Sequence, residues 1–174
     1  MHQRKSKKLI IYFFLFIIIS SINNSDINNF KLDKINNIHI TGLGRENNNI
    51  LFKEIKNLNL ENIFFMNKNK IIKLMESNSL IEKYEVYKRY PSTIYINIEK
   101  TNFFAKINDN GKTFLIGSNG KLTHTEKSFN DLPFIFGKPN IEEFLRFKKI
   151  IDLSNFSYNE IENLYFFPSK RWDI

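Results

Sequence analysis

Residues 84–100 read YEVYKRYPSTIYINIEK, and their pattern decides the fold. In the second half, Ile94, Ile96 and Ile98 point to one side of an extended chain, and the residues between them point to the other. Pro91 cannot continue a hydrogen-bonded ladder, so the sequence predicts a tight turn between two strands. A strand with one apolar and one polar face is typical of a sheet that helices cover on one side only.

A third strand precedes this hairpin. Residues 35–41 alternate around Ile38 and Ile40 and stop at Gly42. Alternation that ends at a glycine predicts a short strand followed by a turn.

Two helical stretches lie between this strand and the hairpin. The first is expected over 49–58, with Asn48 or Asn49 as N-cap, and the second over 67–77, with Asn67 as N-cap. Each has apolar residues at helical spacing: Leu51, Ile55 and Leu58 in the first, and Ile71, Leu74 and Met75 in the second. The order strand, helix, helix, strand, strand predicts a small α+β unit.

The sequence after Lys100 is rich in strand signals. Short strands separated by Asn- and Gly-containing turns are expected at 103–107, 112–116, 121–124 and 132–137. Asn140 is expected to cap a helix that runs to about residue 152, and two more strands follow at 164–167 and 170–174. No turn or cap follows the last strand, so we expect this second domain to be incomplete.

The N-terminal segment is the most apolar part of the chain. A basic tail, residues 1–8, leads into LIIYFFLFIIISSI at residues 9–22. As a helix these residues rise about 21 Å, which is short of the roughly 30 Å hydrocarbon core unless flanking lysines snorkel. An uncleaved transmembrane anchor is favoured, a cleaved signal peptide is the alternative, and a buried core helix is less favoured than either. In both main cases the basic tail stays cytoplasmic, and residues 23–34 form a linker to an exported part.

Composition excludes several classes of protein. The chain has no cysteine, which excludes disulfide scaffolds and thiolate chemistry. It has 26 Lys+Arg against 18 Asp+Glu, a formal charge of +8, but four of the cations lie in the first eight positions. The remainder does not form the basic stripe that a nucleic-acid-binding protein presents.

No set of residues predicts a reaction centre. The histidines at 2, 39 and 124 lack the spacing of metal ligands, and Glu142-Glu143 is more simply explained by the start of a helix. Lys148-Lys149 is expected to face solvent near the end of the same helix. We therefore expect no enzyme activity, no metal, no cofactor and no small-molecule substrate.

Several motifs, in order, resemble one family. The stretch IHITG at 38–42 is similar to an opening "I-x-V-x-G" strand, and 84–100 is similar to "A-x-V-x-R-x-x-P-x-T-L-x-I-x-V-x-E-R". Further on, FLI at 114–116 with Gly120, LPFIFG at 132–137 and RWDI at 171–174 resemble "L-I-D-x-x-G", "L-P-x-x-x-G" and "R-W-D-L". Together they resemble the FtsQ family of bitopic bacterial cell-division proteins, also called DivIB.

This resemblance implies a domain organisation and a function. It implies a POTRA domain at 35–100 and a partial β domain of the FtsQ type at 101–174, on the outer side of the cytoplasmic membrane at the division septum. Members are non-enzymatic scaffolds of the divisome that bind FtsB and FtsL and help to regulate septal peptidoglycan synthesis. The alternative is a secreted or anchored POTRA-type binding module in envelope protein assembly.

The resemblance also implies partner-binding residues. Arg171 stands where an arginine of the family contributes to the partner surface, and Trp172 belongs to the same strand. Tyr95 lies on the sheet face that is expected to meet other divisome proteins. Gly117 departs from the family pattern, because an aspartate is usual at that position.

Overall fold

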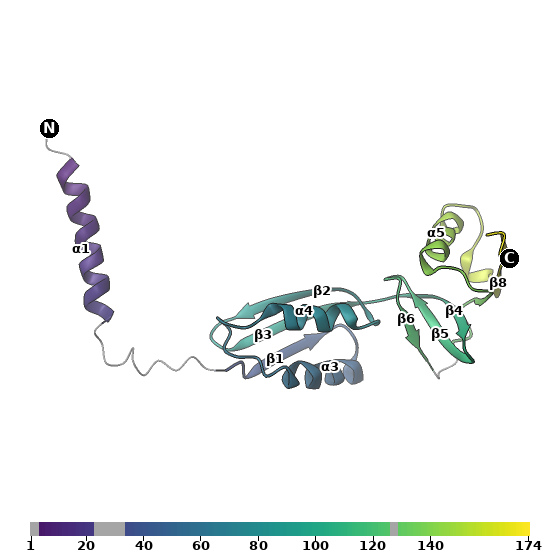
Figure 1. Ribbon diagram of the computed structural model, residues 1–174, viewed down its shortest axis with the longest axis horizontal. Helices are drawn as coiled ribbons and strands as arrows, with labels where there is room; N and C mark the ends of the chain where they lie inside the picture. The colour runs from purple at the N-terminus through teal and green to yellow at the C-terminus, as the bar shows by residue number, and fades with distance from the viewer. Residues whose placement is uncertain (1–3, 23–33, 126–128) are drawn as a thin grey trace. The chain divides into compact units, whose positions relative to one another are not determined.

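The computed structural model describes residues 4–22, 34–125 and 129–174 (Figure 1). The chain divides into two compact units, Met1–Asp33 and Lys34–Ile174. The first contains the helix α1, Arg4–Ile22, whose large apolar side chains from Leu9 to Ile19 are all exposed. In the described ranges no helix meets the length and apolarity that a membrane crossing requires. The predicted linker lies, except for Lys34, outside the described residues.

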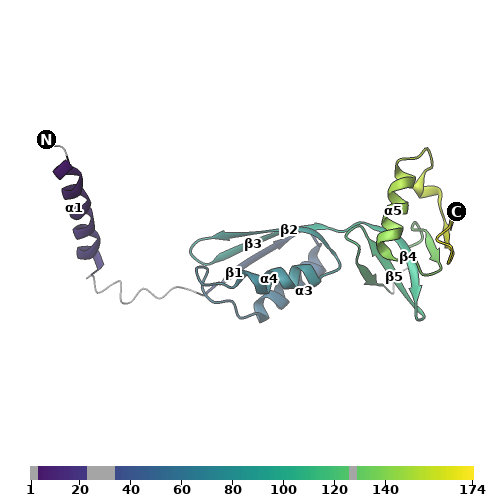
Figure 2. The same cartoon turned by 45° about the horizontal axis from the view of Figure 1, so that its top comes forward.

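The second unit begins with a three-stranded sheet and two helices. Its elements are β1 (Asn37–Thr41), α3 (Arg45–Asn57), α4 (Lys68–Ser77), β2 (Ile81–Arg89) and β3 (Thr93–Lys100). The strand order is β1-β3-β2, with β1 parallel and β2 antiparallel to β3. Both helices lie on the same face of this sheet (Figures 1 and 2). The predicted order of elements and the one-sided covering are confirmed.

The core of this part is built from the alternation seen in the sequence. Ile94 and Ile96 are fully buried and pair with Ile38 and Ile40 across the parallel ladder. The helices contribute Leu51 and Ile55 from α3 and Ile71 and Met75 from α4. Burial of each such side chain favours folding by about 1.5–3 kcal/mol.

The start of α3 differs from the prediction. The helix begins four residues before the expected range, after Gly44 as N-cap, and Asn48 lies inside its first turn. There the Asn48 side chain accepts a hydrogen bond from the Leu43 backbone N–H (3.1 Å), and the Asn48 N–H donates to the Gly44 carbonyl (2.9 Å). Gly44 has a φ of 85°, a conformation that costs glycine little, so the chain can enter the helix earlier than the asparagines suggest. The predicted caps Asn67 and Asn140 are confirmed.

A six-stranded sheet forms the rest of the second unit. Its elements are β4 (Phe103–Asp109), β5 (Lys112–Gly117), β6 (Leu122–His124), β7 (Phe134–Phe136), α5 (Ile141–Asp152), the 3-10 helix η1 (Tyr158–Glu160), β8 (Asn163–Phe166) and β9 (Trp172–Asp173). The strand order is β6-β5-β4-β7-β8-β9, and β7 runs parallel to both β4 and β8. Because parallel neighbours need a crossover, α5 connects β7 to β8. A small core of Ala105, Ile116, Ile135, Phe144 and Leu164 holds α5 against the sheet.

A half-buried cluster of polar side chains joins the two sheets. We define the junction cluster as Glu82, Thr101, Ser118 and Asn119. The Glu82 carboxylate accepts from the hydroxyls of Thr101 (3.1 Å) and Ser118 (2.7 Å). The Asn119 amide donates to the carbonyls of Ser79 (3.0 Å) and Ile81 (2.9 Å), across the junction. The turn between β5 and β6 is therefore fixed to the start of β2 by directional bonds.

Candidate interaction surfaces

The face of the three-stranded sheet away from the helices is open. It carries alternate residues of all three strands, and we call it the open face: Asn37, His39 and Thr41 of β1, Thr93, Tyr95, Asn97 and Glu99 of β3, and Lys83, Glu85, Tyr87 and Arg89 of β2. Their alternation with buried isoleucines places all of them on this side. The open face is thus polar and aromatic.

A row of aromatic side chains crosses the middle of the open face. His39, Tyr95 and Tyr87 are cross-strand neighbours. The rings of His39 and Tyr95 stack, with centroids 4.7 Å apart and planes 14° apart. Arg89 donates to the Tyr95 hydroxyl (3.2 Å), which holds the tyrosine in place. Tyr95, a predicted partner-binding residue, therefore lies at the centre of a preorganised row.

Charged side chains flank this row. The Tyr87 hydroxyl donates to the Glu85 carboxylate (2.5 Å), and this hydrogen bond is the main reason why the pKa of Tyr87 is raised. Lys83 and Glu99 form an exposed ion pair at 3.3 Å, which contributes little to stability. A shallow hollow of about 480 Å³ lies over this end, lined partly by Thr41, Glu85 and Asn97. The open face offers donors, acceptors and two aromatic surfaces to a partner with a polar surface.

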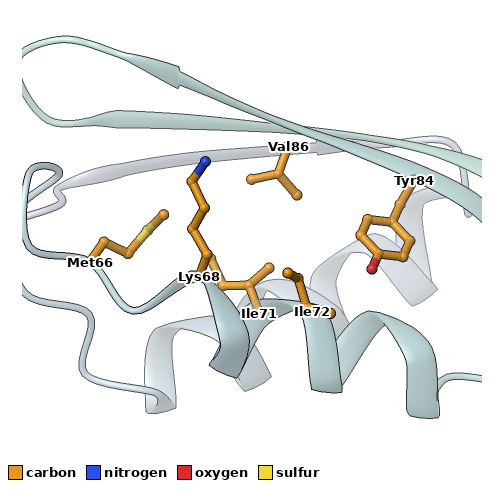
Figure 3. Close-up of a pocket in the computed structure, with 6 residues that line it drawn as sticks. All are labelled: Met66, Lys68, Ile71, Ile72, Tyr84 and Val86. Carbon is orange, nitrogen blue, oxygen red and sulfur yellow. The ribbon is translucent and has the colours of Figure 1, made fainter.

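An apolar groove lies on the opposite side of the same sheet. It runs between α4 and β2 and has a volume of about 220 Å³. Figure 3 shows its lining, with Ile71 and Ile72 of α4 below and Tyr84 and Val86 of β2 above.

The other predicted partner-binding residues lie at the edge of the six-stranded sheet. Arg171 precedes β9; its guanidinium forms an ion pair with Asp173 (2.9 Å) and lies 4.6 Å from the Phe167 ring. Its side chain is 65% exposed, so it is available to a partner. Trp172 is half-buried instead, because its ring stacks on Phe147 of α5 at 4.5 Å. Arg171 and Trp172 are thus adjacent in the chain but have different surroundings, and Tyr95 belongs to the other sheet.

The cluster around Lys148 was not predicted from the sequence. Lys148 was expected to face solvent, but its side chain is only 12% exposed. Its ammonium lies 4.8 Å from the Phe104 ring centroid and 4.2 Å from that of Tyr158, and it pairs with Asp152 at 2.6 Å. The aromatic rings come from residues distant in the chain, so only the fold reveals this cation–π site. It packs α5 onto β4 and η1, and Lys148 is not part of a solvated face as predicted.

In the part of the chain that the structure describes, no group of three or more His, Asp or Glu side chains could hold a metal ion. His39 and His124 are both exposed, on different sheets.

The sequence of this chain is similar to those of known proteins. Residues 33–100 match the family model of the FtsQ-type POTRA domain. The chain is 26% identical over 141 residues to the cell division protein DivIB of Staphylococcus aureus (strain NCTC 8325 / PS 47), a match that covers 80% of this chain and 32% of that protein. It is 27% identical over 181 aligned positions to the cell division protein DivIB of Bacillus subtilis (strain 168), covering 97% of this chain and 65% of that protein. The chain thus spans less than two thirds of the length of both relatives.

Proposed function

Because this chain belongs to the FtsQ/DivIB family of cell-division proteins, we propose that it is a non-enzymatic, membrane-anchored interaction module of the divisome. In this proposal α1 holds the chain in the cytoplasmic membrane as a single pass, with the N-terminus in the cytoplasm. The unit from Lys34 onward lies outside the membrane at the septum. It binds FtsB- and FtsL-type proteins and helps to regulate septal peptidoglycan synthesis.

The observation that carries the proposal is the open face of an FtsQ-type POTRA sheet. It has an ordered aromatic row with polar flanks. Flat faces rich in tyrosine and arginine are typical of protein–protein interfaces, where such residues contribute most of the binding energy. Arg171, exposed at the edge of the other sheet, offers a second contact point.

The exposed apolar side chains of α1 support the anchor. Eleven consecutive large hydrophobic residues, Leu9 to Ile19, are between 47% and 70% exposed. Such a surface is unfavourable in water and favourable in lipid. Lys7 and Lys8 precede this run and fit the cytoplasmic flank of an anchor.

A binding experiment tests the partners. The full chain, solubilised in detergent from its own bacterium, is expected to co-purify with FtsB- and FtsL-type proteins. Arg171→Ala is expected to lower recovery of the FtsB-type protein at least about fivefold. Tyr95→Ala is expected to lower recovery of a partner that binds the open face by a similar factor. Arg146→Ala on α5 and Tyr165→Ala on β8 are matched controls, because both are exposed and lie outside the proposed contacts. Equal recovery for all four variants would contradict the proposed contact residues.

The alternative function, a POTRA-type binding module in envelope protein assembly, is favoured by the same open face. Cell fractionation distinguishes the secreted form of this alternative from the divisome proposal. A shortened chain released from membranes, lacking residues 9–22, would favour a secreted module. A full-length chain retained in the membrane fraction with division proteins would favour the divisome.

A further inference from the structure

Three aromatic side chains project from one end of the three-stranded sheet. Phe64 and Phe65 lie in the loop between α3 and α4, and Tyr90 lies in the turn between β2 and β3. They are 54%, 70% and 59% exposed. We call these three residues the aromatic tip. Clustered exposed aromatic rings are unfavourable in water and indicate a surface that something else covers.

The aromatic tip is held in place. The Asn62 side-chain oxygen accepts hydrogen bonds from the backbone N–H groups of Phe64 and Phe65, both at 3.1 Å. The ring centroids of Phe64 and Tyr90 are 5.0 Å apart, so the two loops contact each other. Between them the Ile63 carbonyl accepts from the Lys88 ammonium (2.6 Å). The rings are therefore presented by a structured end of the domain.

The same two loops surround the point where the chain enters this unit. The Ile35 N–H donates to the Glu61 carbonyl (3.4 Å), and the Asn36 N–H donates to the Ser92 carbonyl (3.1 Å). Lys34 forms an isolated bridge with Asn62. Because β1 and β3 are parallel, both begin at this end, and β3 leads to β4 from the opposite end. The aromatic tip lies where the chain arrives from α1.

The length of chain before Lys34 limits the distance to α1. Residues 23–33 separate Ile22 from Lys34. Fully extended, they span at most on the order of 40 Å. If α1 lies in a bilayer, the tip can reach the bilayer surface.

The charges around the tip suit an anionic surface. Lys34, Lys68 and Arg89 are exposed and adjoin the loops that carry the rings, and Glu61 is an acidic residue beside them. In the sequence, Asp33 directly precedes Lys34. Each cation near an anionic membrane strengthens association by a factor of about five. Aromatic rings at the headgroup level combined with nearby cations are typical of membrane–water interfaces.

We propose that the aromatic tip rests on the surface of an anionic phospholipid bilayer, with Phe64, Phe65 and Tyr90 among the headgroups and Lys34 and Lys68 beside their phosphates. This inference depends on the proposed membrane anchor. It adds a second membrane contact, which sets the orientation of the three-stranded sheet and turns the open face away from lipid and toward partners.

Labelling at single cysteines tests this contact, because the chain has no native cysteine. The full chain is reconstituted into vesicles of phosphatidylglycerol and phosphatidylethanolamine. A polarity-sensitive fluorophore is placed at Phe65→Cys, at Leu153→Cys as a control, and at Phe16→Cys in α1. Leu153 is a matched control because it is a large apolar residue, 80% exposed, at the end of α5. Quenching is measured with lipids spin-labelled near the headgroup for residues 65 and 153, and with lipids spin-labelled along the acyl chain for residue 16.

At residue 65 we expect quenching at least about threefold stronger than at residue 153. Lys34→Gln and Lys68→Gln are each expected to weaken this contact by a factor of about five, and vesicles of phosphatidylcholine alone are expected to weaken it further. Equal quenching at residues 65 and 153 would overturn the proposal, as would a signal at 65 that requires a partner protein.

The site in α1 separates the two proposals. Strong quenching at residue 16 with none at residue 65 would leave the anchor intact and overturn the tip contact. Strong quenching at residue 65 with none at residue 16 would overturn the anchor and support the tip contact. Quenching at neither residue would overturn both.

Discussion

Asn119 connects the two sheets through its side chain. Its side chain donates two hydrogen bonds to carbonyls near the start of β2, and its side-chain oxygen accepts from the Lys121 N–H (3.0 Å). Gly117 leaves room for this arrangement, because a Cβ at that position would lie 2.6 Å from the Asn119 side-chain oxygen. The departure at Gly117 from the family pattern thus has a local steric reason.

Asn119→Ala is expected to lower the free energy of unfolding by about 1–3 kcal/mol, because it leaves the carbonyls of Ser79 and Ile81 without this donor. Urea denaturation of the full chain in detergent measures the change. Asn57→Ala, at the exposed end of α3, is the control and is expected to change stability by less than about 0.5 kcal/mol. Equal effects of both substitutions would contradict the structural role of Asn119.

Tyr158 makes stability sensitive to alkaline pH. Its hydroxyl donates to the Phe104 carbonyl (2.8 Å), and burial, with a smaller contribution from the Asp152 charge, raises the pKa of Tyr158. A group whose pKa is higher in the folded than in the unfolded state stabilises the fold below the unfolded pKa, near 10 for tyrosine. That contribution is lost as the pH rises above this value.

Unfolding free energies measured from pH 8 to 11 test this dependence. Above pH 10 the native chain should lose stability more steeply than Tyr158→Phe, by up to about 1.4 kcal/mol per pH unit. Parallel curves for the native chain and Tyr158→Phe would contradict this role of burial.

At the scale of elements, β3 determines the arrangement of the three-stranded sheet. Its buried and exposed residues alternate as the sequence predicts, because the isoleucines belong to the core that the helices complete and the intervening residues lie on the open face. The alternation of apolar and polar residues was sufficient to predict which side chains of β3 are buried, since the central strand of a one-sided sheet has a period of two.

Substitutions on the two sides of β3 should differ in effect. Ile96→Ala is expected to lower the free energy of unfolding by about 2–5 kcal/mol, because Ile96 is fully buried between the sheet and the helices. Asn97→Ala, the next residue, removes an exposed side chain that accepts from Thr41 and should lower it by less than about 1 kcal/mol. Thermal unfolding followed by circular dichroism distinguishes them, and similar losses would show that the faces are assigned wrongly.

Other elements could not be predicted in full from local pattern. The parallel pairing of β7 with β4 and β8 joins segments that are far apart in the sequence. Because β7 has three residues and β8 has four, neither has a sequence signal for strand direction. Trp172 was predicted only as a partner-binding residue, whereas its stacking on Phe147 depends on how α5 crosses the sheet. The burial of Lys148 could not be predicted for the same reason, because its aromatic neighbours come from β4 and η1.

At the scale of the whole molecule, the chain combines an apolar helix with a unit that presents ordered surfaces. The motifs at 38–42 and 84–100 were sufficient to predict the FtsQ-type POTRA domain, whose family model matches residues 33–100. The contacts with partners could not be predicted to the same depth. Arg171 and Tyr95 lie on different sheets, and which of them meets a given partner depends on surfaces outside this chain.

The central claim is that this chain acts at the division septum through protein contacts. The most direct test is the position of a fluorescent fusion of the full chain in dividing cells of its own bacterium, followed through the cell cycle. We predict a band at midcell that appears before constriction and that weakens in the double variant Tyr95→Ala, Arg171→Ala at equal protein level. A uniform signal around the cell envelope throughout the cycle would contradict the account.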